Sequence, residues 1–98
     1  MPGPFRVSTT SHFDRLAKAL RKRHRQEFVA ALTRAVDILR ADPHNTTGQY
    51  PLRKLVDAHP GQGQFRLRIG RFRFRYNVTG EQHIILVRCS LRRKDTYR

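Results

Sequence analysis

Arginine alternates with apolar residues through the segment 64–76, which reads QFRLRIGRFRFRY and is the strongest chemical signal in the chain. Alternation with period two predicts two β-strands that each bury one face. Gly70 between them supplies the backbone freedom that a tight hairpin needs. The buried face would carry Phe65, Leu67, Ile69, Phe72, Phe74 and Tyr76. The opposite face would carry Arg66, Arg68, Arg73 and Arg75.

A sheet face with charges of one sign favours an anionic ligand, because like charges opposite one another repel. Guanidinium groups bind phosphate through paired hydrogen bonds. The whole chain has 21 Lys and Arg against seven Asp and Glu, a formal net charge of +14. RNA, DNA, an acidic protein and an anionic membrane are the candidate partners, with nucleic-acid phosphate foremost. The alternative is that the arginines keep a small basic protein soluble or bind an acidic protein.

The sequence lacks the residue patterns that metal binding, hydrolysis by a nucleophile elbow and phosphate-loop chemistry require. The histidines and carboxylates are scattered without ligand spacing, so no metal or other cofactor is expected. No nucleophile elbow or glycine-rich phosphate loop is present. The single cysteine, Cys89, lies in an apolar run and is expected to be a buried structural thiol. No stretch approaches the roughly 20 apolar residues of a membrane span, and no secretory signal is recognised, so a cytoplasmic protein is expected.

Metal-free cleavage of RNA is the chemistry that remains. RNA carries its own nucleophile, the 2′-hydroxyl, and a protein can orient it, neutralise charge that develops on the phosphate and protonate the leaving oxygen. Arginines on a rigid sheet can neutralise that charge. Tyr97, an aromatic residue in a charged tail, can stack a base or relay a proton. Its alternative role is to fix the tail against the sheet.

The remaining sequence predicts the elements that position these side chains. A short strand over 5–8 precedes two amphipathic helices, the first reaching about residue 22 and the second ending before Asp42 and Pro43. The second helix would bury Phe28, Leu32, Val36 and Leu39. A short strand within 51–56 and a central strand over 84–87, covered on both faces, complete the sheet. The expected fold class is α+β, a single domain over residues 1–98 with an N-terminal helical hairpin packed on a twisted, mostly antiparallel four- to five-stranded sheet.

Three ordered motifs resemble the RelE/ParE superfamily of bacterial type II toxins. They are residues 52–55 (LRKL), the hairpin over 65–76, and residues 92–97 (RRKDTY). Residues 13–16 (FDRL) and 42–43 (DP) are also similar to the family. The resemblance covers nearly the whole chain and implies the same compact fold.

The resemblance implies one of two activities. RelE-like members cut mRNA, typically in the ribosomal A site, with basic residues on the sheet and a C-terminal tyrosine. ParE-like members share the fold, poison DNA gyrase and lack that basic set. By position, Arg66 and Arg68 match the catalytic lysines, Arg73 the phosphate-stabilising arginine, and Tyr97 the terminal tyrosine. The implied catalytic set is completed by Arg92 and Arg93, in the basic cluster of the last motif. The implied RNA-binding set is Lys54, Arg66, Arg68, Arg71, Arg75 and Lys94.

Two departures from the family pattern favour phosphate binding over proton transfer. Arginine stands where lysine is usual, and a guanidinium with a pKa above about 12 is a poor general base. Arg92 stands where histidine often begins the last motif. The leading hypothesis is a toxin that acts as a ribosome-dependent mRNA endoribonuclease by 2′-hydroxyl transesterification. The alternatives are a gyrase inhibitor and a catalytically inactive relative. The expected partners are mRNA on the ribosome and a cognate antitoxin with an acidic segment, in a heterotetramer or larger complex.

Overall fold

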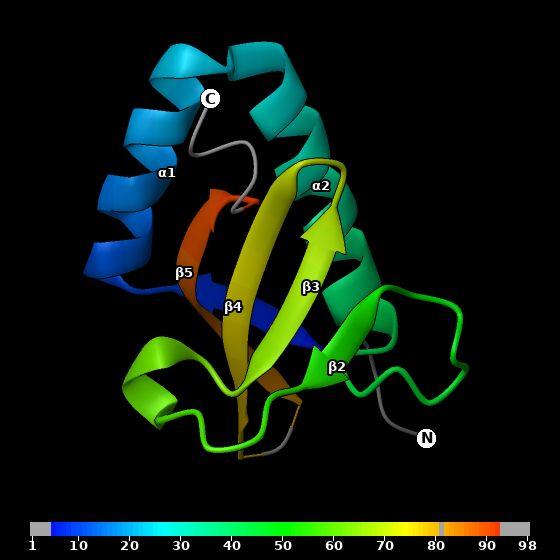
Figure 1. The fold of residues 1–98 in the computed structure, drawn as a ribbon. Coiled ribbons are helices and arrows are strands. Elements are labelled where there is room, and N and C mark those ends of the chain that lie inside the picture. Colours follow the sequence, from blue (N-terminus) through cyan, green and yellow to red (C-terminus); the bar gives the residue numbers. More distant parts are fainter. Residues whose placement is uncertain (1–4, 81, 93–98) are drawn as a thin grey trace.

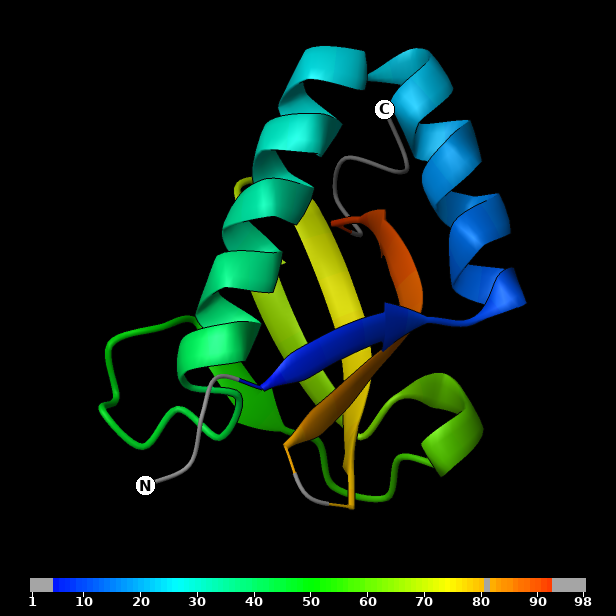
Figure 2. The same cartoon turned by 180° about the vertical axis from the view of Figure 1, so that it is seen from behind.

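Two helices cover one face of a five-stranded sheet and leave its other face open (Figures 1 and 2). The structure is a computed structural model that describes residues 5–80 and 82–92. In chain order the elements are β1 (Arg6–Thr9), α1 (Ser11–Arg23), α2 (Arg25–Ala41), β2 (Leu52–Lys54), the short 3₁₀ helix η1 (Pro60–Gln62), β3 (Phe65–Ile69), β4 (Phe72–Thr79) and β5 (His83–Leu91). The predicted α+β class, with a helical hairpin on a sheet, is confirmed.

The sheet has the strand order β1-β5-β4-β3-β2. All neighbouring strands are antiparallel except β1 and β5, which run parallel. The long strands β4 and β5 therefore lie inside the sheet, while the short strands β1 and β2 form its edges. Short edge strands limit the exposed backbone that another chain could pair with.

The first helix begins where the sequence supplies a side-chain cap. Thr10 precedes α1, and its hydroxyl accepts a hydrogen bond from the Phe13 amide at 3.0 Å, which satisfies one free donor of the first turn. Basic residues occupy the last turn of α1, where they face the negative end of the helix dipole. His24 separates the two helices, so the hairpin forms within a single residue of non-helical backbone.

The buried face of α2 differs from the predicted stripe. Phe28 and Leu39 are buried as expected, but Leu32 and Val36 are only half-buried. The residues buried instead are Ala31, Ala35 and Ile38. Small side chains allow the helix backbone to approach the sheet closely, so α2 turns the face that carries its alanines toward the sheet. Leu32 lies beside this face, next to residues of α1.

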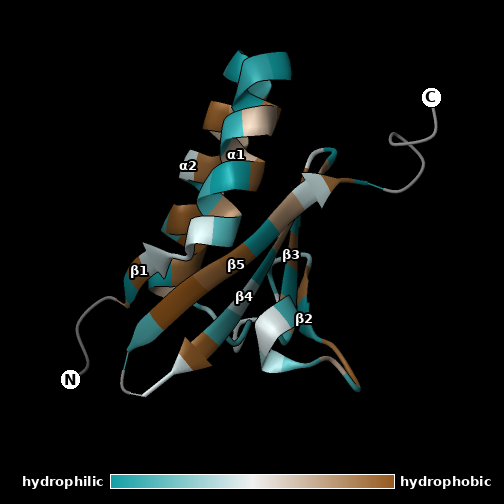
Figure 3. Cartoon of the chain, turned by 90° about the vertical axis from the view of Figure 1, so that its left-hand side faces the viewer, coloured by the Kyte–Doolittle hydropathy of each residue, from teal (hydrophilic) through white to brown (hydrophobic). Residues whose placement is uncertain are grey.

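The core fills the space between the helices and the sheet. Leu67, Phe74 and Tyr76 are fully buried on the helix side of β3 and β4, and Figure 3 shows hydrophobic residues along much of β5. The Tyr76 hydroxyl donates to the Pro43 carbonyl at 2.6 Å, and burial raises its pKa. Cys89 is buried as expected, and burial raises the pKa of its thiol to about 12.

A buried carboxylate ends α2 and fixes the loop that follows. Asp42 is 7% exposed and accepts hydrogen bonds from the amides and hydroxyls of Thr46 and Thr47 at 2.7–3.0 Å. Burial alone would raise the pKa of Asp42, but these four donors outweigh it and lower the pKa to about 2. The segment leading to β2 is thereby held against the end of the helix.

Candidate nucleic-acid interface

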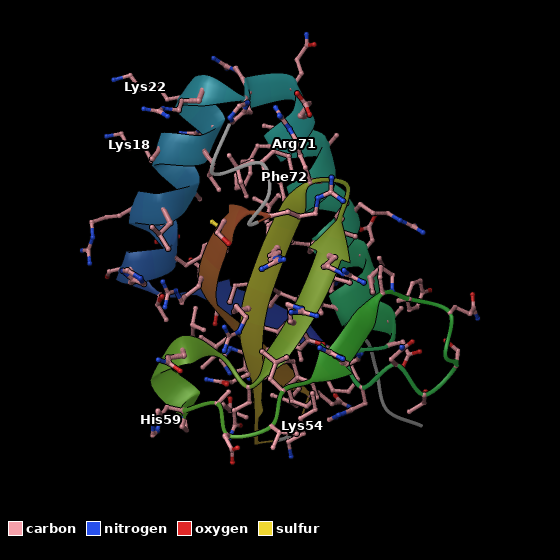
Figure 4. The ribbon with its side chains drawn as sticks, in the orientation of Figure 1. Lys18, Lys22, Lys54, His59, Arg71 and Phe72 are labelled. Carbon is pink, nitrogen blue, oxygen red and sulfur yellow. The ribbon has the colours of Figure 1, made fainter. Side chains whose placement is uncertain are left out.

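The β3–β4 hairpin separates its arginines from its apolar residues as the alternation predicts. Gly70 has a φ of +57° in the two-residue turn between Ile69 and Phe72, a conformation that favours glycine. The paired positions place Arg68 opposite Arg73, on the other face from the buried apolar residues. Figure 4 shows nitrogen-tipped side chains along β3 and β4 on the face turned away from the helices.

A row of four arginines crosses the sheet at right angles to the strands. Arg53 of β2 lies opposite Arg66, Arg66 lies opposite Arg75, and Arg75 lies opposite Arg88 of β5. Directly opposed side chains on antiparallel strands have Cβ atoms roughly 4.5–5.5 Å apart. We call Arg53, Arg66, Arg75 and Arg88 the arginine row. Sequence reasoning found its two central members but missed Arg53 and Arg88.

A β-bulge in β5 brings Arg88 into the arginine row. Arg75 pairs with Arg88 but the next residue, Tyr76, pairs with Leu86, so that Val87 is the extra residue. Leu86 and Cys89 are both buried, whereas Arg88 is exposed. Without this shift, strict alternation from Leu86 would turn Arg88 toward the helices. The change of phase after the apolar run 84–87 is the signal in the sequence that could have revealed it.

The open face is electrostatically unbalanced. Burial lowers the pKa of Arg66, and the positive charges of Arg53, Arg73, Arg68 and Arg75 lower it further. The pKa of Arg75 is lowered by burial and then by Arg88. Strands β2 to β5 contain no acidic residue, and within residues 5–80 and 82–92 no carboxylate forms an ion pair with the arginine row. A bound anion would relieve this repulsion.

Arg68 and Arg73 form a second opposed pair beside the arginine row, with Ser90 of β5 opposite Arg73. Arg68 is exposed and Arg73 is half-buried. The Nε of Arg73 is buried and has no hydrogen-bond partner in the described part of the chain. A buried donor without an acceptor is costly, so this group is expected to pair when an acceptor binds beside Arg73.

The loop before β3 covers one end of the open face and holds Arg75. The Nε and Nη2 of Arg75 donate to the Gly63 carbonyl at 3.0 and 2.7 Å. Asn77 fixes the same loop by accepting from the Gln64 amide and donating to the Pro60 carbonyl. Gly63 has a φ of +87°, and a Cβ there would lie 2.7 Å from the Cβ of Arg75. Arg75, which the sequence suggested as an RNA ligand, is therefore partly occupied by its own chain.

Two other residues of the predicted RNA-binding set lie away from the arginine row. Arg71 donates from Nε and Nη2 to the Glu27 carboxylate at 3.0 Å each, and from Nη2 to Nδ1 of His24 at 2.8 Å. It therefore joins the hairpin turn to α2, at the position labelled in Figure 4. Lys54 shares the strand face of buried Leu52, so that Arg53 occupies the open face of β2 in its place.

The last motif is described only at its first residue. Arg92 is half-buried, and its amide donates to the Arg71 carbonyl at 2.7 Å, which places it at the end of β5 beside the hairpin turn. Arg93, Lys94 and Tyr97 lie outside the described residues. Across residues 5–80 and 82–92, no three His, Cys, Asp or Glu side chains gather to hold a metal ion. No helix in the same ranges has the length and apolar character needed to cross a membrane.

The chain thus has two helices on one face of a mostly antiparallel sheet and a cationic open face on the other, the arrangement expected from its resemblance to the RelE/ParE superfamily. A solved structure, the RelBE2 toxin–antitoxin complex from Mycobacterium tuberculosis, contains a chain that matches with a TM-score of 0.68 and 21% identity, over 91% of this chain and 99% of that one. The family profile described as ParE toxin of type II toxin–antitoxin system, parDE, matches residues 5–96. The chain therefore belongs to the ParE toxin family of type II toxin–antitoxin systems. A comparison with curated proteins found no significant match.

Proposed function

We propose that this toxin is a metal-independent mRNA endoribonuclease that acts on the ribosome. The observation that carries the proposal is the open sheet face, where Arg68 lies directly opposite Arg73 and Arg66 opposite Arg75, with no acidic residue in strands β2 to β5. Such a face suits the backbone of a single-stranded nucleic acid, because guanidinium groups bind phosphate in a bidentate geometry.

The chemistry would be transesterification within the RNA. The 2′-oxygen loses its proton and bonds to phosphorus, the bond from phosphorus to the 5′-oxygen breaks, and that oxygen gains a proton. The products are a 2′,3′-cyclic phosphate and a 5′-hydroxyl. Arg66, Arg68 and Arg73 would bind the phosphate oxygens and stabilise the added negative charge of the transition state.

Proton transfer would come from groups other than the sheet arginines. The pKa of Arg66 is lowered by burial and by neighbouring arginines, but a guanidinium remains protonated at neutral pH. Arg92 or Arg93 would stabilise the leaving oxygen, and Tyr97 would orient or stack the nucleotide. The proton steps fall to Tyr97 or to groups of the ribosome.

The proposal is tested by mapping 5′ ends of cellular RNA after induced expression. Wild-type toxin should arrest growth and create new 5′-hydroxyl ends within coding regions. Arg68→Gln, at an exposed position, should reduce these ends by about 10²-fold if its guanidinium stabilises the transition state. Arg34→Gln on α2 has the same change of charge and should leave them unchanged. Growth arrest with intact mRNA would overturn the proposal.

Gyrase inhibition is a second candidate, favoured by the match of residues 5–96 to the ParE toxin family. It requires no proton transfer, in keeping with arginine at the positions where the RelE-like pattern has lysine. A supercoiling assay with purified gyrase separates the two. Inhibition by wild-type toxin, together with intact mRNA in cells, would establish the second function in place of the first.

We further propose an antitoxin partner whose acidic segment covers the open face. The structural neighbour was solved as a toxin–antitoxin complex, and the net charge of +14 favours an acidic partner. A cytoplasmic heterotetramer or larger assembly is the expected form. Because charge would dominate, affinity should fall steeply as ionic strength rises. Binding that is equally tight at 0.1 and 1 M salt would contradict this interface.

A further inference from the structure

A hollow of about 430 Å³ lies at the edge of the sheet beside the arginine row. Its lining consists of Tyr50, Pro51, Leu52, Arg53, Arg66 and Arg68. The volume falls within the range of ligand pockets, about 300–1,000 Å³. Three of the lining residues are arginines and none is acidic. The hollow thus joins a cationic wall to a wall with aromatic and apolar character.

The apolar wall is held in place by one asparagine. The amide group of Asn45 donates to the carbonyls of Tyr50 and Leu52 at 2.9 and 3.1 Å, and its side-chain oxygen accepts from the Tyr50 amide at 3.2 Å. Pro51 is tied to β3, because its carbonyl accepts from the Arg68 amide at 3.0 Å. Tyr50 is half-buried and packs against the core. The segment 50–52 is therefore ordered before any ligand binds, which lowers the entropic cost of binding.

The hollow differs from its neighbour across Arg53. That neighbour has a volume of about 470 Å³ and includes Asp57 and Val56 in its lining. Val56 is 88% exposed, and the carboxylate of Asp57 disfavours a phosphate. The hollow at Tyr50 combines guanidinium groups with an aromatic residue, the combination by which proteins bind single-stranded nucleic acid. An acidic peptide would use only the guanidinium groups, and the aromatic residue would have no part in binding it.

We propose that this hollow binds one nucleotide of single-stranded RNA, next to the phosphate held by Arg66, Arg68 and Arg73. Tyr50 stacks on the base, and Arg53 binds the nucleotide's own phosphate. Arg68 lines the hollow and also lies opposite Arg73, so the two phosphates are neighbours along one strand. The assignment rests on the proposed RNA cleavage for its biological meaning, and it adds Tyr50 and Arg53 as residues that position the substrate.

The base contact is tested with two uncleavable oligomers and purified toxin. One is tetra-adenylate with every 2′-hydroxyl methylated, and the other is the same backbone without bases. Tyr50→Leu should raise the Kd of the base-bearing oligomer about 10-fold and leave the abasic one unchanged. Tyr50→Phe, which keeps the ring, should stay within twofold of wild type for both. Equal losses for both oligomers in Tyr50→Leu would show that Tyr50 acts only on the fold, and would overturn the stacking role.

The phosphate contact is tested at Arg53, which is exposed. Arg53→Gln should weaken both oligomers about 3- to 10-fold, and should reduce the slope of log Kd against log salt by about 0.7, the value for one phosphate of a single strand. Arg34→Gln is the matched control and should stay within twofold of wild type. An equal effect of the two variants, or displacement of both oligomers by poly-glutamate as readily as by RNA, would overturn the proposal.

Mapping RNA 5′ ends separates this inference from the proposed function. If wild-type toxin cuts mRNA and Tyr50→Leu cuts at the same positions and rates, the hollow is not a substrate subsite although the endoribonuclease assignment stands. If the oligomers bind with the predicted pattern but no RNA is cut in cells, the hollow stands as a nucleotide site and the endoribonuclease assignment fails.

Discussion

The two faces of the β3–β4 hairpin have opposite environments although they belong to the same short stretch of chain. On the helix side, Leu67 and Phe74 are fully buried. On the other side, Arg66 and Arg68 stand among like charges with no acidic residue in the four strands β2 to β5. Alternation along the strands therefore separates the residues that stabilise the fold from the arginines that we propose to bind RNA. Changes on one face should leave the function of the other largely intact.

Arg71 and Arg66 show the same difference between a structural and a ligand-facing environment, although both are arginines. Arg71 pairs with Glu27 and His24 and so joins the hairpin to α2. Arg66 has arginines as its charged neighbours. The difference follows from place in the hairpin, since Arg71 lies in the turn and Arg66 in the strand. The sequence alone assigns both residues the same role, because both are arginines of the same hairpin.

The largest effect is expected from the buried face. Phe74→Ala removes a fully buried ring and should lower the free energy of unfolding by about 3–5 kcal/mol, because it loses apolar burial and leaves a cavity. Chemical denaturation measures the change. A cost below 1 kcal/mol would mean that this face is not the core.

A somewhat smaller effect is expected at Asp42. Asp42→Ala should cost about 2–4 kcal/mol, because it removes charge-assisted hydrogen bonds and leaves their donors buried. The folded pKa of about 2 lies below the ordinary value of 3.8. The wild-type carboxylate therefore contributes stability that is fully present above about pH 4 and is lost as the pH falls toward 2. The free energies of unfolding of wild type and Asp42→Asn, measured by denaturation between pH 2 and 6, should converge at the acid end. A difference between them that is constant with pH would refute the assignment.

A substitution at Gly63 tests how closely the loop before β3 approaches the end of the open face. An alanine there would place its Cβ 2.7 Å from both the Cβ of Arg75 and the Cγ2 of Val87, at a φ of +87°. Gly63→Ala should destabilise the fold by about 1–3 kcal/mol. Gly61→Ala is the matched control, since a Cβ at Gly61 meets nothing within 4 Å. Equal melting temperatures for the two variants would contradict the close approach.

The smallest effects on stability, with opposite signs, are expected from the two contrasted arginines. Arg66→Gln should raise the free energy of unfolding by about 0.5–1 kcal/mol by relieving repulsion, while it weakens RNA binding. Arg71→Gln should lower stability by about 0–1 kcal/mol, as is usual for a surface ion pair, and leave RNA binding within twofold. Thermal unfolding and RNA titration check both. The contrast fails if both variants change stability in the same direction.

Period-two alternation is a local property, and it was sufficient to predict the hairpin and the two faces of its strands. The members of the arginine row on other strands were missed because their positions depend on register. Arg53 is set by how β2 pairs with β3, and Arg88 by the bulge at Val87. The partners of Arg71 and Arg75 were missed for a similar reason, because Glu27 and Gly63 come close to them only in the folded chain.

The salt dependence of RNA binding tests most directly that the open face holds the RNA backbone. The slope of log Kd against log salt is measured with a single-stranded RNA for wild type, Arg68→Gln with Arg73→Gln, and Arg34→Gln. The double variant should reduce the slope by about 1.4, the value for two phosphates of a single strand, and raise the Kd by at least 10-fold. Arg34→Gln should match wild type. A slope that is unchanged in the double variant would contradict the account.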